Sequence, residues 1–471
     1  MRYLLKHSSL TTAALLAVFL AGCNVGPKYK RPNYPVPPAF RGADNADASS
    51  DPKGSLGDEQ WATVFQDPTL QDLIKTALAN NYDVRIAAQH ILEQQAQVQI
   101  TRSQQFPTLS VGGTGAGADI PSLNTSTSTI SPLVEGAFSL SAAWTPDFWG
   151  LYRKQTAAAR AQLLAQTWAQ RAVRMTLVQQ IATAYLQLRT LDQQLEITRQ
   201  ALKTRQDSLD LTRTLEQGGA APLSDVRQAE ELLYTASSEI PQLEQQIQQQ
   251  ENAINLLLGN NPGPLTHGSA SALTPPPQDL PVGLPSQLLE RRPDIQQAEA
   301  TLIAANAQIG VARAQFFPQL TISGSAGIGG NSFPSIFGAN SQTIYGIGQL
   351  AQPIFEGGKL RGQLTLSQET EKEMVLSYQK TIAGAFRDVS NALIALNKQR
   401  AYREQQEKLV AAAQDATRLA RVRYKGGATS YLEVLTTDSN LYTDQLSLAS
   451  AQQSEALTLV QLYSALGGGW Q

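Results

Sequence analysis

Histidines, a cysteine and one glycine-rich segment are the parts of this chain that could bind a metal, act as a nucleophile or hold a phosphate. The three histidines, His7, His90 and His267, lie far apart with no cysteine beside them, and their spacing matches no zinc site. Segment 112–117, GGTGAG, has the glycines but not the spacing of a dinucleotide-binding or phosphate-binding loop. We therefore expect no enzyme, no bound metal and no cofactor other than a covalent lipid.

The lipid is expected on Cys23, the only cysteine of 471 residues. Two basic residues, the apolar run 10–21 and then LAGC (20–23) have the layout of an export signal, and the run is shorter than the ~20 residues that span a bilayer. A lone cysteine has no disulfide partner; the alternative is a small buried side chain. LAGC resembles a bacterial lipoprotein signal, and Asn24 replaces the aspartate associated with inner-membrane retention. We predict a signal peptide at 1–22 and an acylated, membrane-tethered Cys23.

Composition narrows the class of protein further. The formal net charge is −2 and 16% of residues are charged, against ~25% in ordinary globular proteins. This near-neutral charge balance argues against nucleic acid as a partner. Hydrophobic residues make up 42%, and glutamine is abundant. Thin apolar stripes with much uncharged polar surface favour an elongated or hollow protein over one with a large apolar core.

The chain contains a tandem duplication. Segments 82–113 and 293–324 align without a gap at an offset of 211 residues, and 217–226 aligns with 425–434 at an offset of 208. Segment 261–285 is rich in proline and small residues, as linkers are. Two copies of one structural unit are therefore joined by a linker.

Each copy has the same order of elements. Four stretches with apolar and small residues in alternation, or rich in glycine, predict strands of about ten residues: 108–118, 136–144, 320–330 and 343–352. A run from 151 to 217 without proline or glycine predicts a very long helix, and a second helix returns from the Gly218-Gly219 turn. Pro241 should bend that second helix. Spacings of 3 and 4 predict a coiled-coil stripe at Leu177, Ile181, Ala184, Leu188, Leu191 and Leu195, and on the returning helix at Val226, Ala229, Leu233, Ala236, Ile240, Leu243 and Ile247.

These elements divide the chain into five parts: a signal peptide (1–22), a lipidated extended arm (23–60), a first repeat (61–260) with a strand pair at about 106–148 and a hairpin tip at 218–225, the linker (261–285), and a second repeat (286–471) with a strand pair at about 317–355 and a tip at 426–433. Four strands cannot close a membrane barrel, which needs at least ~8, and an open sheet edge is not viable in lipid. The strand number therefore predicts that several copies of the chain associate, and three copies would supply twelve strands.

Four segments carry a family resemblance: CNVGPKYKRP (23–32), ERRPDIQQAEATLIAANAQIGVARAQFFPQLTISG (290–324), RYKGGATSYLEVL (423–435) and LGGGW (466–470). Together they resemble the outer-membrane efflux proteins, the TolC-like channels, and within them the lipoprotein branch paired with drug pumps. The resemblance implies a mixed α+β membrane protein: a homotrimer with long coiled-coil helices forming a periplasmic tunnel and four strands per subunit in one shared transmembrane β-barrel.

The function that the resemblance implies is a passive exit duct for drugs and other small toxic compounds. Its partners would be a periplasmic adaptor, an inner-membrane pump that supplies the energy, and outer-membrane lipids. Two alternatives stay open: a type I secretion outlet for whole proteins, and a periplasmic coiled-coil adaptor without a pore. The strand pairs and the lipoprotein signal favour a channel.

Two sets of residues at the hairpin tips are candidate functional sites. Both turns keep a Gly-Gly-Ala core, and small residues permit close approach of a partner. We predict adaptor contacts at Gly218, Gly219, Gly426, Gly427, Thr429 and Ser430, although a helix C-cap also explains such glycines.

The second set is a periplasmic gate at Asp225 and Glu433, which occupy equivalent places just beyond the tips. In related channels an acid at the second of these places helps line the constriction, and an acid one turn further on often joins it. That further place holds Thr436 in this chain, which leaves a double acidic ring in question. The alternative is that both carboxylates only complement the dipole of the helix that begins beside them. Ser224 with Asp225, and Ser430 with Glu433, are the expected start signals of these helices.

Overall fold

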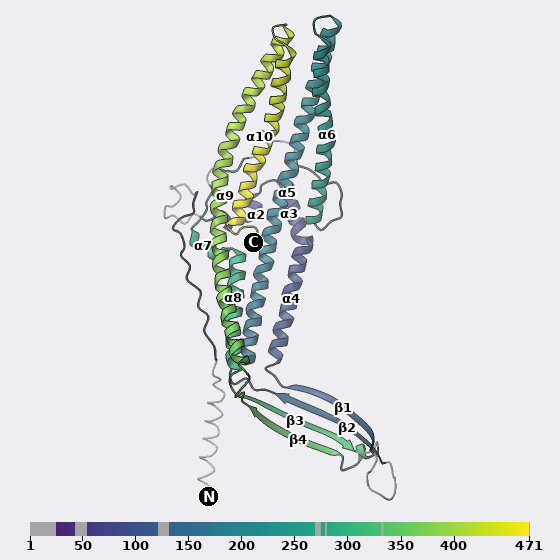
Figure 1. Ribbon diagram of the computed structural model, residues 1–471, viewed down its shortest axis with the longest axis vertical. Coiled ribbons are helices and arrows are strands. Elements are labelled where there is room, and N and C mark those ends of the chain that lie inside the picture. The colour runs from purple at the N-terminus through teal and green to yellow at the C-terminus, as the bar shows by residue number, and fades with distance from the viewer. Residues whose placement is uncertain are drawn as a thin grey trace. The chain divides into compact units, whose positions relative to one another are not determined.

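The computed structural model describes residues 25–42, 54–120, 131–268, 275–277, 280–330 and 334–470 (Figure 1). The predicted signal peptide and Cys23 lie outside them. The chain forms two compact units, one from Met1–Pro32, Ile91–Gln166 and Ala298–Tyr378, and the other from Asn33–His90, Thr167–Gln297 and Gln379–Gln471. Each unit therefore takes segments from both predicted repeats. The exact limits of the repeats, the arm and the linker stay a prediction.

The first unit contains one antiparallel sheet of four strands in the order β1-β2-β3-β4: β1 (Thr108–Ile120), β2 (Ser131–Trp144), β3 (Gln319–Gly330) and β4 (Gln342–Ala351). Each predicted stretch falls on one of these strands, apart from a residue at the end of the fourth. Strands β2 and β3 come from different repeats and pair over Gly136–Trp144 and Ile322–Gly330. The pairing of β2 with β3 thus joins the two repeats in the middle of the sheet, and β1 and β4 are the edges of the sheet.

The long helices repeat with equal lengths. Helix α5 (Leu151–Gln217) and α9 (Lys359–Lys425) have 67 residues each, and α6 (Leu223–Leu257) and α10 (Tyr431–Ala465) have 35 each. All four keep the 208-residue offset, whereas α4 (Tyr82–Ser103) and α8 (Pro293–Ala314), with 22 residues each, keep the 211-residue offset. The predicted mixed α+β fold and its tandem duplication are confirmed. Pro241 lies inside α6, which continues past it.

The chain also has shorter elements: the 3₁₀ turns η1 (Leu56–Asp58) and η2 (Ser335–Phe337), and the helices α2 (Trp61–Val64), α3 (Pro68–Asn80) and α7 (Pro285–Arg291). Helix α3 begins after Asp67, whose carboxylate accepts hydrogen bonds from the N–H groups of Thr69 and Leu70. Within the described residues, no helix has both the length and the apolar character needed to cross a bilayer.

Coiled-coil packing in the second unit buries most of the predicted stripes. On α5, Ile181 and Leu188 are no more than 1% exposed, and on α6 Ala229 and Ala236 are equally buried. Near the tips the two hairpins α5–α6 and α9–α10, which stand side by side with their turns at one end (Figure 1), share a core. Its members are Leu209, Val226, Ala229, Ala420, Tyr431 and Val434. The apolar stripe therefore joins hairpin to hairpin as well as helix to helix.

The predicted helix starts are partly wrong. Helix α6 begins at Leu223 with Pro222 as its N-cap residue, so Ser224 lies in the first turn. Ser430 is the N-cap residue of α10, but its side chain makes no capping hydrogen bond. Proline has a preset φ that suits a helix entry, and at α10 the hydroxyl that binds the first-turn carboxylate is that of Thr429.

Candidate gate and docking tips

The two hairpin turns have the same backbone geometry. Gly219 and Gly427 both have a φ of +71°, the left-handed conformation that favours glycine. The N–H of Ala220 donates to the carbonyl of Leu215 at 2.7 Å, and that of Ala428 to Arg423 at 2.8 Å. These are Schellman C-caps. The second glycine of each pair is therefore required by the end of the helix.

The first glycine of each pair has a different role. Gly218 and Gly426 do not have a positive φ, and an added Cβ would meet only carbonyl oxygens of its own helix at 3.5 Å or more. All four glycines are exposed, as is Ser430, and Thr429 is half-buried. Neither packing nor backbone strain excludes a larger residue at Gly218 or Gly426, so a small residue there leaves the surface of the tip open.

Asp225 and Glu433 occupy equivalent positions but have different partners. The hydroxyl of Tyr424, on the other hairpin, lies 3.4 Å from Asp225 Oδ2, which is a long hydrogen bond. Glu433 accepts from Arg423 Nη1 at 2.8 Å and from the hydroxyl of Thr429, both within its own hairpin. Asp225 thus links the two hairpins, and Glu433 braces the turn of one.

Two hydroxyl groups near the tips, those of Tyr424 and Thr436, also make hydrogen bonds. Burial raises the pKa of the Tyr424 hydroxyl, so that the group stays protonated and able to donate to Asp225. Thr436, where the family often has a further acid, is exposed and donates to the carbonyl of Leu432 at 2.8 Å. Its hydroxyl is therefore directed to the backbone of its own helix.

A buried charge cluster that the sequence analysis missed lies deeper between the hairpins. Asp438 accepts from Arg205 Nε at 2.8 Å and from Arg421 Nη2 at 2.5 Å. Arg205 and Asp438 have side chains 3% and 10% exposed. Arg205 also donates to the carbonyl of Leu232 at 3.0 Å and lies 4.9 Å from the ring centre of Tyr442. An available signal was that Asp438 continues the 3–4 spacing of Tyr431 and Val434, which places a charge on the buried stripe.

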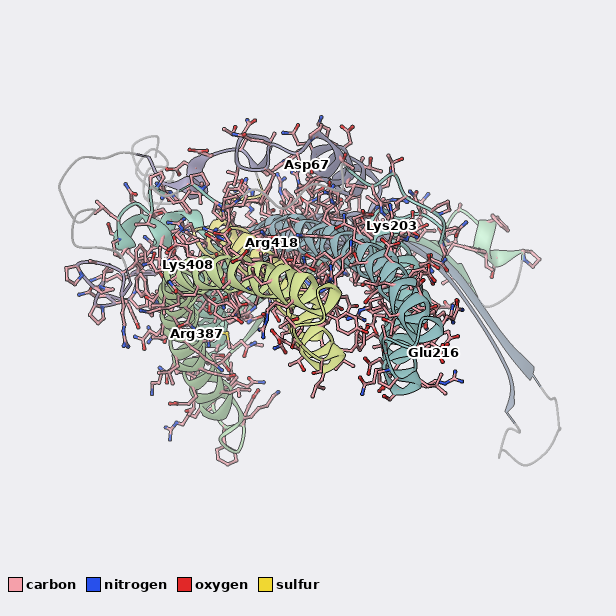
Figure 2. All side chains as sticks on the ribbon, turned by 90° about the horizontal axis from the view of Figure 1, so that it is seen from above. Asp67, Lys203, Glu216, Arg387, Lys408 and Arg418 are labelled. Atoms are coloured by element: carbon pink, nitrogen blue, oxygen red, sulfur yellow. The ribbon has the colours of Figure 1, made fainter. Side chains whose placement is uncertain are left out.

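The ion pairs and hydrogen bonds at the tips join neighbouring helices and the two hairpins. In the described part of the chain, no group of three or more histidine, cysteine, aspartate or glutamate side chains is placed to bind a metal ion. Viewed along the helices, charged side chains extend from both hairpins, with Lys203 and Glu216 on α5 and Lys408 and Arg418 on α9 (Figure 2). Both hairpins therefore carry charged side chains along their length.

Comparison with known proteins gives the family. The family model described as "Outer membrane efflux protein" matches residues 73–260 and 284–468. The chain is 32% identical to the cation efflux system protein CusC of Escherichia coli over 97% of this chain and 98% of that one. It is 34% identical to the probable efflux pump outer membrane protein TtgC of Pseudomonas putida, over 98% and 96%.

Solved structures agree with the sequence comparison. One is CusC, whose structures are described as showing conformational changes that accompany folding and transmembrane channel formation. Its sequence is 30% identical to this chain, and the TM-score is 0.83 over 95% of this chain and all of that chain. The open state of the MtrE outer membrane channel of Neisseria gonorrhoeae is 28% identical, with a TM-score of 0.83 over 95% and 99%. Both the family model and relatives matched over nearly their whole length agree. The chain therefore belongs to the outer membrane efflux protein family: it is the non-enzymatic channel component of an efflux system, located in the outer membrane and extending into the periplasm.

Proposed function

We propose that three copies of the chain form one duct, with twelve strands in a shared β-barrel and their hairpins in a periplasmic tunnel. The observation that carries this proposal is the four-stranded sheet with two unpaired edges, β1 and β4. Large apolar side chains on the two edge strands are exposed: Leu109 and Val111 on β1 are 73% and 80% exposed, and Ile344 on β4 is 82% exposed. In a membrane, lipid covers such side chains. The backbone N–H and C=O groups along the two edges, however, need further strands as hydrogen-bond partners.

The test of this assembly is the mass of the protein in mild detergent by light scattering, together with its ion conductance in a planar bilayer. We expect a trimer that conducts. A monodisperse monomer that still conducts ions would contradict the argument from strand number, because four strands would then suffice for a pore.

The cargo that we propose is drugs and other small toxic compounds, delivered by an inner-membrane pump through a periplasmic adaptor. The relatives support small molecules, since their names describe cation efflux, antibiotic efflux and toluene efflux. Deletion of the gene should lower the tolerated drug concentration, and the purified protein should bring down an adaptor and a pump. Copurification with an ATP-driven protein exporter would instead favour the secretion outlet.

For the gate, we propose that Asp225 with Tyr424 and Glu433 with Arg423 hold the tips closed. The contacts at 3.4 Å and 2.8 Å are what support it. Tyr424→Phe combined with Glu433→Gln should let a large antibiotic that is normally excluded enter the cell. Thr436→Ala is the matched control, because its hydroxyl is bonded only to its own helix. Unchanged exclusion in the double variant would contradict the gate.

For the docking tips, we propose that the four glycines with Thr429 and Ser430 contact the ends of the adaptor's helical hairpin. The geometry separates docking from capping. Gly426→Trp should leave trimer melting unchanged but remove adaptor cross-linking and drug resistance. Gly427→Asn should be tolerated, since asparagine adopts positive φ, and Gly427→Trp should loosen the turn itself. Normal cross-linking and resistance in Gly426→Trp would refute docking at this turn.

A further inference from the structure

A histidine attaches the linker between the two repeats to the first hairpin. His267 lies in the linker, and its Nδ1 atom is 3.0 Å from both carboxylate oxygens of Asp192 on α5. Its Nε2 atom is 3.1 Å from Oε1 of Glu251 on α6. The N–H of Leu265 donates to the same glutamate oxygen at 2.9 Å. One imidazole ring, 25% exposed, therefore joins the linker to both helices of the α5–α6 hairpin.

The two contacts of His267 need more protons than a neutral ring carries. Ionised carboxylates only accept hydrogen bonds, and a neutral imidazole donates from one of its two nitrogens. Both contacts therefore exist together only when the ring is protonated, or when Asp192 carries the extra proton. Burial raises the pKa of Asp192, which favours keeping a proton in the cluster. Once that proton is lost, one ring nitrogen and one carboxylate face each other with lone pairs only.

The other groups that face this cluster among the described residues are Tyr185 and Arg189 on α5 and Asp67 ahead of α3. A Cβ added to Gly268 would lie 2.6 Å from both the Tyr185 hydroxyl and Arg189 Nη1, so the linker backbone lies close against α5. The Tyr185 hydroxyl donates to Asp67, and its pKa is raised to about 12. A guanidinium stays charged. The imidazole and the two carboxylates beside it are therefore the groups left to respond to a mild change in pH.

A second contact attaches the linker to the other hairpin. Nη2 of Arg400, on α9, donates to the carbonyl oxygens of Pro276 and Pro277 at 3.3 Å and 2.8 Å. Nε of the same residue donates to Glu455 on α10 at 3.2 Å, and the Glu455 side chain is 1% exposed. Because a guanidinium does not lose its proton in proteins, this attachment is the same at every ordinary pH.

We propose that His267, Asp192 and Glu251 form a proton-dependent clasp that fastens the linker to the α5–α6 hairpin. In mild acid the cluster holds its second proton, both contacts form, and the linker is tied across the two hairpins. At mildly alkaline pH the ring donates to one carboxylate only, and the linker stays tied to the α9–α10 hairpin alone. An imidazole ordinarily changes charge between about pH 5 and 8, which places the change near neutral pH. The clasp needs neither the proposed trimer nor the proposed cargo.

The test is hydrogen exchange of the full-length protein in detergent, followed by mass spectrometry on peptides that cover 262–268. The amide of Leu265 reports the clasp directly, because it is bonded to Glu251. Protection is the measured rate relative to that of the same peptide unfolded at the same pH. We expect protection of this amide to fall about tenfold between about pH 5.5 and about pH 8, as one charge-assisted hydrogen bond is lost.

Two variants of the ring should remove the pH dependence in opposite ways. His267→Gln has no titrating group, and its protection at both pH values should equal that of the native protein at about pH 8. His267→Arg keeps a permanent charge with several donors, and its linker should stay protected at both pH values. His90→Gln is the matched control, since His90 is exposed on α4, and it should behave as the native protein does.

Three results would overturn the clasp. One is equal protection of the native linker at the two pH values. Another is a His267→Gln protein that keeps the native pH dependence, because the proton would then belong to a different group. The third is a His267→Arg protein whose linker still loosens in alkali.

Discussion

At the scale of single residues, Arg205, Asp438 and Arg421 form a charge cluster that links the two hairpins near the tips. Charges removed from water are tolerated only when they are paired, and loss of one partner leaves the other uncompensated. Asp438 lies between guanidinium groups from two hairpins. We infer that the cluster holds the two hairpins of one chain together near the tips.

Arg205→Ala should accordingly lower the stability of the tip region by about 3 kcal/mol. Hydrogen exchange of the backbone amides in 420–440 measures it, and these amides should exchange faster. The control is Arg199→Ala, since Arg199 and Glu244 form a pair 53% and 46% exposed, for which we expect a change within about 0.5 kcal/mol. Equal exchange in the two variants would show that the buried cluster is not needed for tip stability.

Tyr185 gives a prediction about pH. Burial, together with the hydrogen bond of 2.6 Å that its hydroxyl donates to Asp67, raises the pKa of Tyr185 to about 12. An unfolded tyrosine has a pKa of about 10. The folded state therefore disfavours ionisation, and this contribution to stability is complete below about pH 10 and is lost as the pH rises through about 12.

Tyr185→Phe should cost about 2 kcal/mol at neutral pH, because Asp67 loses a buried donor. The difference between the two proteins should shrink above about pH 10, where the native protein loses the stabilisation that the variant never had. Urea unfolding at about pH 8 and about pH 11 measures both. A difference that is the same at both pH values would argue against a role for the tyrosine proton.

At the scale of elements, the sheet depends on close contact between β2 and β3. A Cβ added to Gly327 would lie 2.3 Å from the carbonyl oxygen of Phe138 and 2.9 Å from Cα of Ser139. These are backbone atoms, which cannot rotate away as a side chain can. Glycine at this position therefore permits the strands of the two repeats to pair.

Gly327→Val should destabilise the sheet by about 3 kcal/mol through overpacking and reduce the amount of trimer recovered from outer membranes. Gly348→Ala is the control, since an added Cβ there has nothing within 4 Å, and its yield should equal that of the native protein. Recovery of the Gly327→Val trimer at native levels would mean that β2 and β3 can separate at this point without cost.

At the scale of the whole molecule, attachment to the membrane has two proposed sources, the strands and the lipid on Cys23. Only the thiol forms the thioether, so Cys23→Ser should abolish labelling with palmitate. The trimer should still be found in the outer membrane, because the strands hold it there. Palmitate on the Cys23→Ser protein would contradict acylation at this residue.

Much of the architecture could be derived from the sequence because it is encoded locally. The run without proline or glycine from 151 to 217 coincides with helix α5, since helical hydrogen bonds join residues four apart and each turn depends on its neighbours. Alternating side chains predicted the strands for a similar reason. The duplication needed only a comparison of the chain with itself. A helix C-cap was the alternative role considered for the glycine turns, and their second glycines do have positive φ.

The partners of the tip residues were decided only by the tertiary structure. Asp225 and Glu433 hold equivalent places in the two repeats, yet one meets Tyr424 on the other hairpin and the other meets Arg423 on its own. Arg205 and Asp438 are 233 positions apart, and no local period relates them. Which charges meet depends on how far one hairpin is rotated and shifted against the next, and that is set by the packing of the whole apolar core at once.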